Sequence, residues 1–248
     1  MSAILPGLKN ANDLSTFLEN LKAGKTFITD PPAERWTKEK FYSPNPEKWK
    51  TKTTRGGFCV LPTEKDKMRW KIPPLVLPHI DPNQFRLFVT VEEALKQSKL
   101  LEKPEILENT SLICGNMMDS DFLFWEHASV RFHYLADFIK NQNIALGDEF
   151  FARIKNDLHS FSPDNSTSGI DSMLGARVAK FFNLKGGTLS LDAVCATGIV
   201  AIDFATHALR SRELEAVVVC SSNMGMSGPL FCTYNDLTAL SPTNEIRP

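Results

Sequence analysis

The stretch from Thr188 to Arg210 constrains the fold more than any other part of this 248-residue chain. Its first residues alternate in character and follow Gly186 and Gly187, a pattern that predicts a short buried strand ending at Cys195. Beyond the cysteine, apolar and alanine residues recur at helical spacing and predict a helix packed tightly inside the protein: Ile199, Ile202, Ala205, Ala208 and Leu209. Cys195 is therefore predicted to lie at a strand-to-helix turn.

A cysteine at such a turn has chemical possibilities that an ordinary core cysteine lacks. The free N–H groups and the positive end of the helix dipole favour a thiolate and can hold an oxyanion. Spacing alone leaves open the alternative that Cys195 is a buried small hydrophobic residue. The five cysteines form no C-x-x-C pair, so neither a zinc site nor a disulfide framework is predicted. Four of them are expected to fill the core or its margin: Cys59, Cys114, Cys220 and Cys232.

The residues around Cys195 resemble the active-site signature of the β-ketoacyl synthases. Residues 192–202 read Asp-Ala-Val-Cys-Ala-Thr-Gly-Ile-Val-Ala-Ile, which is similar to the family's Asp-Thr-Ala-Cys-Ser-Ser-Ser-Leu run before a buried helix. Residues 209–219 resemble the end of that helix and the next strand. Residues 240–242 and 247–248 resemble the family's Ala-Leu-Ser-Pro and Arg-Pro-Phe-Asp segment.

Two departures from the signature indicate a divergent ketosynthase of a polyunsaturated-fatty-acid or polyketide type. Val194 stands where the family has alanine, and Ala196, Thr197 and Gly198 replace its serine-rich turn. Small residues are nevertheless kept where the backbone must pack closely.

The resemblance continues upstream of the signature. The most specific match is residues 80–95, similar to the family's Met-Asp-Pro-Gln-Gln-Arg-Leu helix; Asp81 and Pro82 open this helix, and Phe85 is an inserted departure. An amphipathic helix over 12–24, capped by Asn12 or Asp13, resembles the family's first ketosynthase helix. Other similar landmarks are Arg35, Trp36, residues 56–58, a helix over 170–182 capped near Ser168 and containing Arg177, and the turn 183–187.

Strands expected at 110–114, 189–194 and 216–220 alternate with these helices, which indicates an α/β fold with a largely parallel sheet. The resemblance implies the N-terminal half of a thiolase-like layered fold, with a largely parallel mixed sheet and a buried nucleophile helix. It also implies one β-ketoacyl synthase N-terminal domain over 1–248, incomplete at both ends, because residues 1–7 fall just after the family's first core strand. Uncovered strand edges would then make the isolated chain poorly soluble or oligomeric.

Composition excludes several classes of protein. A net charge of −1 gives no general attraction to nucleic acid or membrane, and no apolar stretch reaches the length of a membrane span or a secretory leader, so we expect the cytosol.

The segment 34–71 carries eleven basic against five acidic residues, which predicts a solvated face or a docking patch for an acidic partner. No metal site is predicted, since three histidines lack ligand spacing and two aspartates are typical turn formers: His127, His133, His159, Asp119 and Asp121.

By resemblance, the reaction is a decarboxylative Claisen condensation in fatty-acid or polyketide biosynthesis, with Cys195 as the nucleophile. No cofactor is expected to bind directly, because substrates are carried on the phosphopantetheine of an acyl carrier protein. A homodimer and other domains of a multidomain synthase are the remaining expected partners. The resemblance implies that the family's two histidines and supporting lysine would lie beyond Pro248. His207 is about 18 Å from Cys195 along the helix, too far to act beside the sulfur. Cys195 is therefore the one residue of this chain to which the resemblance assigns a catalytic role. The alternatives are a truncated non-catalytic fragment or pseudoenzyme with a dimer or docking role, and a thiolase-type acyl-CoA condensing enzyme.

Overall fold

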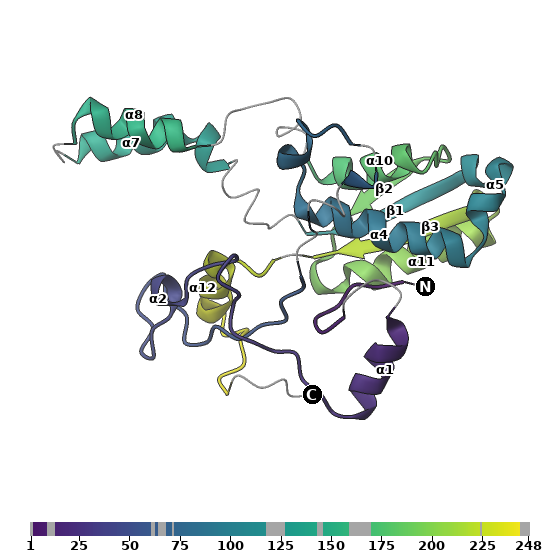
Figure 1. Cartoon of the computed structure of the whole chain (residues 1–248), viewed down its shortest axis with the longest axis horizontal. Coiled ribbons are helices and arrows are strands. Elements are labelled where there is room, and N and C mark those ends of the chain that lie inside the picture. Colours follow the sequence, from purple (N-terminus) through teal and green to yellow (C-terminus); the bar gives the residue numbers. More distant parts are fainter. Residues whose placement is uncertain are drawn as a thin grey trace.

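A three-stranded parallel sheet organises the chain in this computed structural model (Figure 1), which describes residues 2–8, 13–60, 63, 68–70, 72–117, 127–142, 146–158, 170–223 and 225–243. The strands are β1 (Thr110–Asn116), β2 (Thr188–Leu191) and β3 (Ala216–Ser222), in the order β2-β1-β3. Cys114 on β1 is in register with Ser190 on β2 and with Cys220 on β3. The α/β fold is thus confirmed, and the sheet formed by the described residues is parallel throughout.

Helices cover both faces of the sheet (Figure 1). The helices α4 (Pro82–Gln97) and α10 (Asp171–Phe181) pack on one face, and α11 (Thr197–Arg210) packs on the other. The larger apolar core lies on the α4 and α10 side, where Leu112, Leu174 and Val178 are buried. A smaller core joins Ile113 to Ala201 and Ala205 of α11. Two faces covered by helices are typical of a parallel sheet, whose strands are apolar on both sides.

Helix α4 begins as its sequence predicts. The Asp81 carboxylate accepts a hydrogen bond from the Asn83 N–H, and Pro82 occupies the first turn, where its missing N–H costs nothing. The unusual Phe85 is completely buried and packs against Trp70 and Phe88. The departure from the family pattern therefore serves the core.

Strand β2 is shorter and more exposed than the sequence predicts. It ends at Leu191, and a short 3-10 helix, η3 (Val194–Ala196), follows before α11. Thr188 and Leu189 are exposed, and the other two residues are half-buried. The expectation of a buried strand reaching Cys195 is wrong because β2 lies at the edge of the described sheet and pairs only with β1.

Helix α11 is buried on one face only. The predicted helix is confirmed, but the residues that touch the sheet are its small ones, Ala201 and Ala205, whereas Ile199 and Ile202 face solvent. Small residues let a helix approach a sheet closely, and here they decide which face is buried. The expected tight burial of the larger apolar residues is therefore wrong for the described part of the chain.

The described part of the N-terminal third is mostly loop, as predicted, and its helices include α1 (Leu14–Lys22) and α2 (Lys38–Phe41). Asp13 precedes α1 without making a side-chain cap, Asn12 lies outside the described residues, and Gly24 follows the helix with a φ of 61°, which glycine adopts readily. The apolar side of α1 is partly exposed at Leu18 and Leu21, so this helix contributes little to the core.

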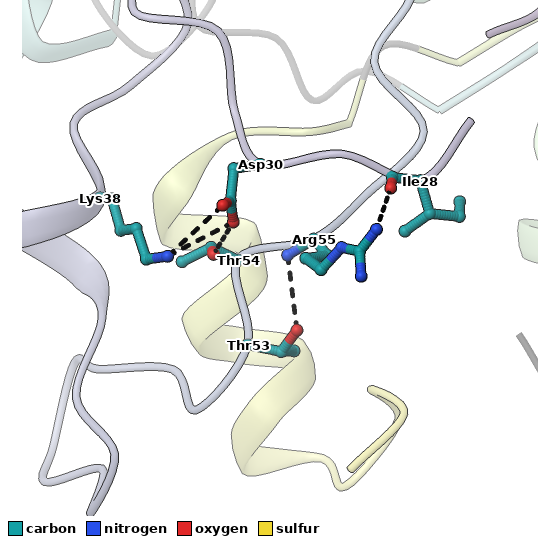
Figure 2. A network of polar contacts seen from close by, with 6 residues as sticks. All are labelled: Ile28, Asp30, Lys38, Thr53, Thr54 and Arg55. Carbon is teal, nitrogen blue, oxygen red and sulfur yellow. Dashed lines mark hydrogen bonds and ion pairs between the residues drawn. The ribbon is translucent and has the colours of Figure 1, made fainter. Parts of the chain in front are cut away.

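Polar contacts hold the loop 28–30 against the loop 53–55 (Figure 2). Asp30 accepts hydrogen bonds from the Thr54 hydroxyl and the Lys38 ammonium, while the Arg55 guanidinium donates to the Ile28 carbonyl. The Thr54 hydrogen bond, followed by the charge of Lys38, lowers the pKa of Asp30 below its ordinary value. These contacts add to an antiparallel bridge between Thr29 and Gly56, which joins the same two loops through their backbones.

The remaining elements connect or extend the core. Helices α7 (Phe132–Asn141) and α8 (Asp148–Asp157) form a pair with its own small apolar core, and Figure 1 shows this pair away from the sheet. Helix α12 (Gly228–Asp236) packs against α2 through Trp36, Phe41 and Phe231. The other described elements are η1 (Leu77–His79), η2 (Leu100–Glu102) and α5 (Pro104–Glu108). The predicted cap Ser168, the pair Asp119 and Asp121, and residues 247–248 lie outside the described residues.

Candidate active site

The candidate site lies where the carboxyl ends of the three strands meet. Asn116 ends β1, Ser222 ends β3, and Cys195 follows β2 by four residues. In open α/β sheets this edge is the usual place for a ligand, because the loops that follow the strands converge there. The topology therefore brings the predicted nucleophile to the edge of the sheet that most often carries function.

A small cavity of about 80 Å³ opens beside Cys195. Its wall is built by segments that are distant in the sequence and converge on the strand ends: Asn116, Met117, Val194, Cys195, Thr197, Ser221, Ser222, Asn223 and Tyr234. Tyr234 comes from α12, a helix that sequence reasoning did not predict. No periodic pattern pointed to Asn116, Asn223 or Tyr234, since their role depends on tertiary contact.

The turn that carries Cys195 is closed by two polar side chains. The Asp192 carboxylate accepts a hydrogen bond of 2.8 Å from the Val194 N–H. The Thr197 hydroxyl accepts one of 2.8 Å from the Ala193 N–H and donates one of 2.7 Å to the Val194 carbonyl. Cys195 thereby lies in η3, two residues before α11, and the first N–H of α11, that of Thr197, donates to the Val194 carbonyl.

Cys195 is exposed, whereas the other four cysteines are half-buried or buried. The prediction that those four fill the core or its margin is confirmed. Burial raises the pKa of the Cys59 and Cys232 thiols. The Cys220 thiol donates to Cys114, so the hydrogen bond raises the pKa of Cys220 and lowers that of Cys114 inside the sheet. Accessibility therefore separates Cys195 from the rest.

None of the histidines in the described part of the chain lines the cavity beside Cys195. His207 lies near the far end of α11, with its Nδ1 3.7 Å from an Asp203 carboxylate oxygen. His127 and His133 are exposed, and His159 lies outside the described residues. Cys195 is thus the candidate nucleophile, and no histidine of the described residues lines the cavity next to it.

The structure also bears on metal sites and on membrane-spanning helices. Among the described residues, no group of three or more histidine, cysteine or acidic side chains could hold a metal ion. A search of the same residues found no helix with the length and apolar character needed to cross a membrane.

The basic surplus between residues 34 and 71 is partly used inside the molecule. Lys38 pairs with Asp30, Arg69 pairs with Glu92, and the Lys50 ammonium donates to the Lys40 carbonyl. The Lys48 ammonium lies over the exposed Trp49 ring. The segment borders α12, because the Lys52 N–H donates to the Asn235 side chain at 3.2 Å.

Relatives of known function share this part of their chains with the protein. The highly reducing polyketide synthase verA of Penicillium polonicum is 25% identical over 242 residues, which are 96% of this chain and 8% of that relative. The lovastatin diketide synthase mokB of Monascus pilosus is 23% identical over 234 residues, or 94% of this chain and 8% of that relative. The chain therefore spans about 8% of the length of these curated relatives.

Solved structures share the fold. The oxazolomycin ketosynthase domain OzmH of Streptomyces albus superposes with a TM-score of 0.65 at 21% identity, covering 94% of this chain and 35% of that one. The ketosynthase from module 6 of the bacillaene synthase of Bacillus subtilis gives a TM-score of 0.64 at 18% identity, covering 98% of this chain and 34% of that one.

A family comparison matches residues 1–248 to the N-terminal domain of the β-ketoacyl synthases. The match covers the whole chain, including the parallel sheet, the turn that carries Cys195 and helix α11. The resemblance noted in the sequence is therefore confirmed, and the chain belongs to the β-ketoacyl synthase family.

Proposed function

We propose that this chain supplies the nucleophile half of a ketosynthase that performs decarboxylative Claisen condensation in polyketide or fatty-acid biosynthesis. The observation that carries the proposal is the place of Cys195: it is the exposed cysteine among five, at the carboxyl edge of a parallel sheet and at the start of α11. Family membership supports the reaction class.

In the first half-reaction, the Cys195 sulfur attacks the carbonyl carbon of an acyl thioester carried on the phosphopantetheine of an acyl carrier protein. A new carbon–sulfur bond forms, and the carrier thiolate leaves and takes up a proton. The N–H groups of Ala196 and Thr197 already donate to the Ala193 and Val194 carbonyls, so the later N–H groups of the first turn of α11 are the proposed donors for the oxyanion of the tetrahedral intermediate. No cofactor takes part in this exchange.

In the second half-reaction, a malonyl-type thioester loses carbon dioxide and leaves a carbanion. The carbanion attacks the carbonyl of the acyl group on Cys195, the new carbon–carbon bond forms, and the Cys195 thiolate is released. This step needs groups that stabilise an enolate, and no histidine of the described residues lines the cavity. We therefore expect the 248 residues alone to accept an acyl group without condensing it.

The proposal extends to partners of the complete protein. An acyl carrier protein delivers the substrates. Further domains are supported as neighbours, because this chain spans 8% of the polyketide synthase verA and 5% of the hybrid PKS-NRPS synthetase apdA of Emericella nidulans. A homodimer and a cytosolic location belong to the same proposal.

Cysteine labelling tests the assignment of the nucleophile. The folded chain is treated with iodoacetamide near neutral pH, and the modified peptides are quantified by mass spectrometry; Cys195 is expected to react first, because it is the exposed cysteine. A Cys195→Ala variant is the control for the identity of the peptide. Preferential labelling of Cys59 or Cys232 with Cys195 silent would contradict the assignment.

Acyl transfer tests the half-reaction itself. The chain is incubated with an acyl-carrier thioester, and its intact mass is measured with and without Cys195→Ala. A mass increase confined to the cysteine-containing chain supports the enzyme, whereas no increase supports a non-catalytic fragment. Transfer from acyl-CoA in preference to the carrier thioester would favour a thiolase-type enzyme.

A further inference from the structure

The residue just before Cys195, Val194, has a backbone conformation that valine rarely adopts. Val194 has a φ of 54°, in the left-handed region, although it is a β-branched residue without a glycine's freedom. Its side chain is exposed, so packing around this side chain does not enforce the conformation. Some other contact must hold the turn in this state.

The Thr197 hydroxyl provides that contact. It joins both sides of the strained residue, since it accepts from the Ala193 N–H and donates to the Val194 carbonyl. Thr197 is only 6% exposed, so water does not readily replace these hydrogen bonds. Asp192 adds a bond to the Val194 N–H from the other side of the turn.

Gly115 on β1 makes room for this side chain. A methyl group added at Gly115 would meet the Thr197 methyl carbon at 2.5 Å, closer than real carbon atoms approach one another. The end of β1 therefore lets the Thr197 hydroxyl reach back into the turn.

We propose that Thr197 is a positioning residue that clamps the strained turn at Val194 and so holds the Cys195 sulfur at the start of α11. The inference deepens the proposed function and rests on the role of Cys195 as nucleophile. Without the hydroxyl, Val194 relaxes toward a negative φ, and the sulfur moves away from the N–H groups of the helix. Thr197 acts through the turn and touches no substrate in this role.

The test measures the rate at which iodoacetamide alkylates Cys195 in the full chain, with Cys59 and Cys232 followed in the same sample. Thr197→Val keeps the shape and removes the hydroxyl, so the Cys195 rate is expected to fall about tenfold, because the half-buried Ala193 N–H loses its partner and the Val194 carbonyl keeps only the Thr197 N–H. Thr197→Ser restores the hydroxyl and is expected to stay within about twofold of the unchanged chain. Thr206→Val is the matched control, since the Thr206 hydroxyl on the same helix donates to the Ile202 carbonyl at 2.8 Å, away from the turn.

A second variant separates positioning from general damage. Val194→Gly in the Thr197→Val background is expected to restore part of the lost rate, because glycine adopts a positive φ without strain. If Thr197→Val alone unfolds the chain, Cys59 and Cys232 will react faster as well, and the comparison then uses Thr197→Ala against Thr197→Ser.

The outcomes are distinct. A Cys195 rate that falls in Thr197→Val and recovers in Thr197→Ser, with Cys59 and Cys232 unchanged, supports the clamp. Equal Cys195 rates in the Thr197→Val and unchanged chains overturn the clamp and leave the proposed function standing. A Cys195 that never reacts, even in the unchanged chain, overturns both.

Discussion

The solvent-facing apolar residues of α11 are expected to drive self-association of the chain. Ile199, Ile202 and Phe204 are 72%, 54% and 55% exposed. Full burial of such a side chain is worth about 1.5–3 kcal/mol, so burying the exposed parts of these three stabilises a complex by about 4 kcal/mol per copy. Since about 1.4 kcal/mol is a factor of ten, replacing all three by glutamine is expected to weaken association by about a thousandfold for each α11 surface that the contact buries.

Sedimentation velocity over a range of concentrations measures this effect. The control replaces three similarly exposed residues that are scattered over other segments, Val60, Leu75 and Leu237, which are 76%, 87% and 66% exposed. The control should associate as the unchanged chain does, because isolated exposed apolar residues are ordinary on protein surfaces. A monomeric unchanged chain at every concentration, or a control that loses association as much as the α11 variant, would refute the reasoning.

Three other predictions concern separate parts of the molecule. Phe85→Ala is expected to lower the free energy of unfolding by about 3–5 kcal/mol in urea denaturation, because the ring is completely buried among Trp70 and Phe88, whereas the exposed Phe138→Ala should change it little. Thr54→Val is expected to raise the pKa of Asp30 toward its ordinary value, which NMR titration measures. Because the pKa is lowered in the folded state, the ionised Asp30 stabilises the fold above its unfolded pKa, and this stability is lost as the pH falls through the folded pKa. The loss should be smaller in the variant. An unchanged Asp30 titration would contradict the role of the Thr54 hydrogen bond and leave the lowered pKa to Lys38 and Arg55. Reversing Lys48, Lys50 and Lys52 to glutamate is expected to weaken carrier-protein affinity at low salt and to have no effect at high salt, if the segment beside α12 is the docking face; equal affinity at low salt would return the segment to a solvated loop.

Helix α4 shows which features local sequence predicts and which depend on packing between distant segments. Asp81 and Pro82 are local signals for the start of α4, and the helix begins there. The aromatic ring of Phe85 among polar neighbours had no local explanation, and only the approach of Trp70 from the preceding loop showed that it belongs to the core. Caps act between residues a few positions apart, whereas a core contact joins segments that the sequence does not relate.

The sequence by itself determined the family, the presence of a strand before Cys195 and a helix after it, and the parallel α/β class, because periodicity, caps and the signature are local patterns. Only the tertiary structure decided that β2 is an exposed edge, that the alanine face of α11 meets the sheet, and that Asn116, Asn223 and Tyr234 line one cavity with Cys195. It also showed that the Thr197 hydroxyl closes a turn strained at Val194. These features depend on which distant surfaces come into contact and on backbone angles, and neither is written in the spacing of residues along the chain.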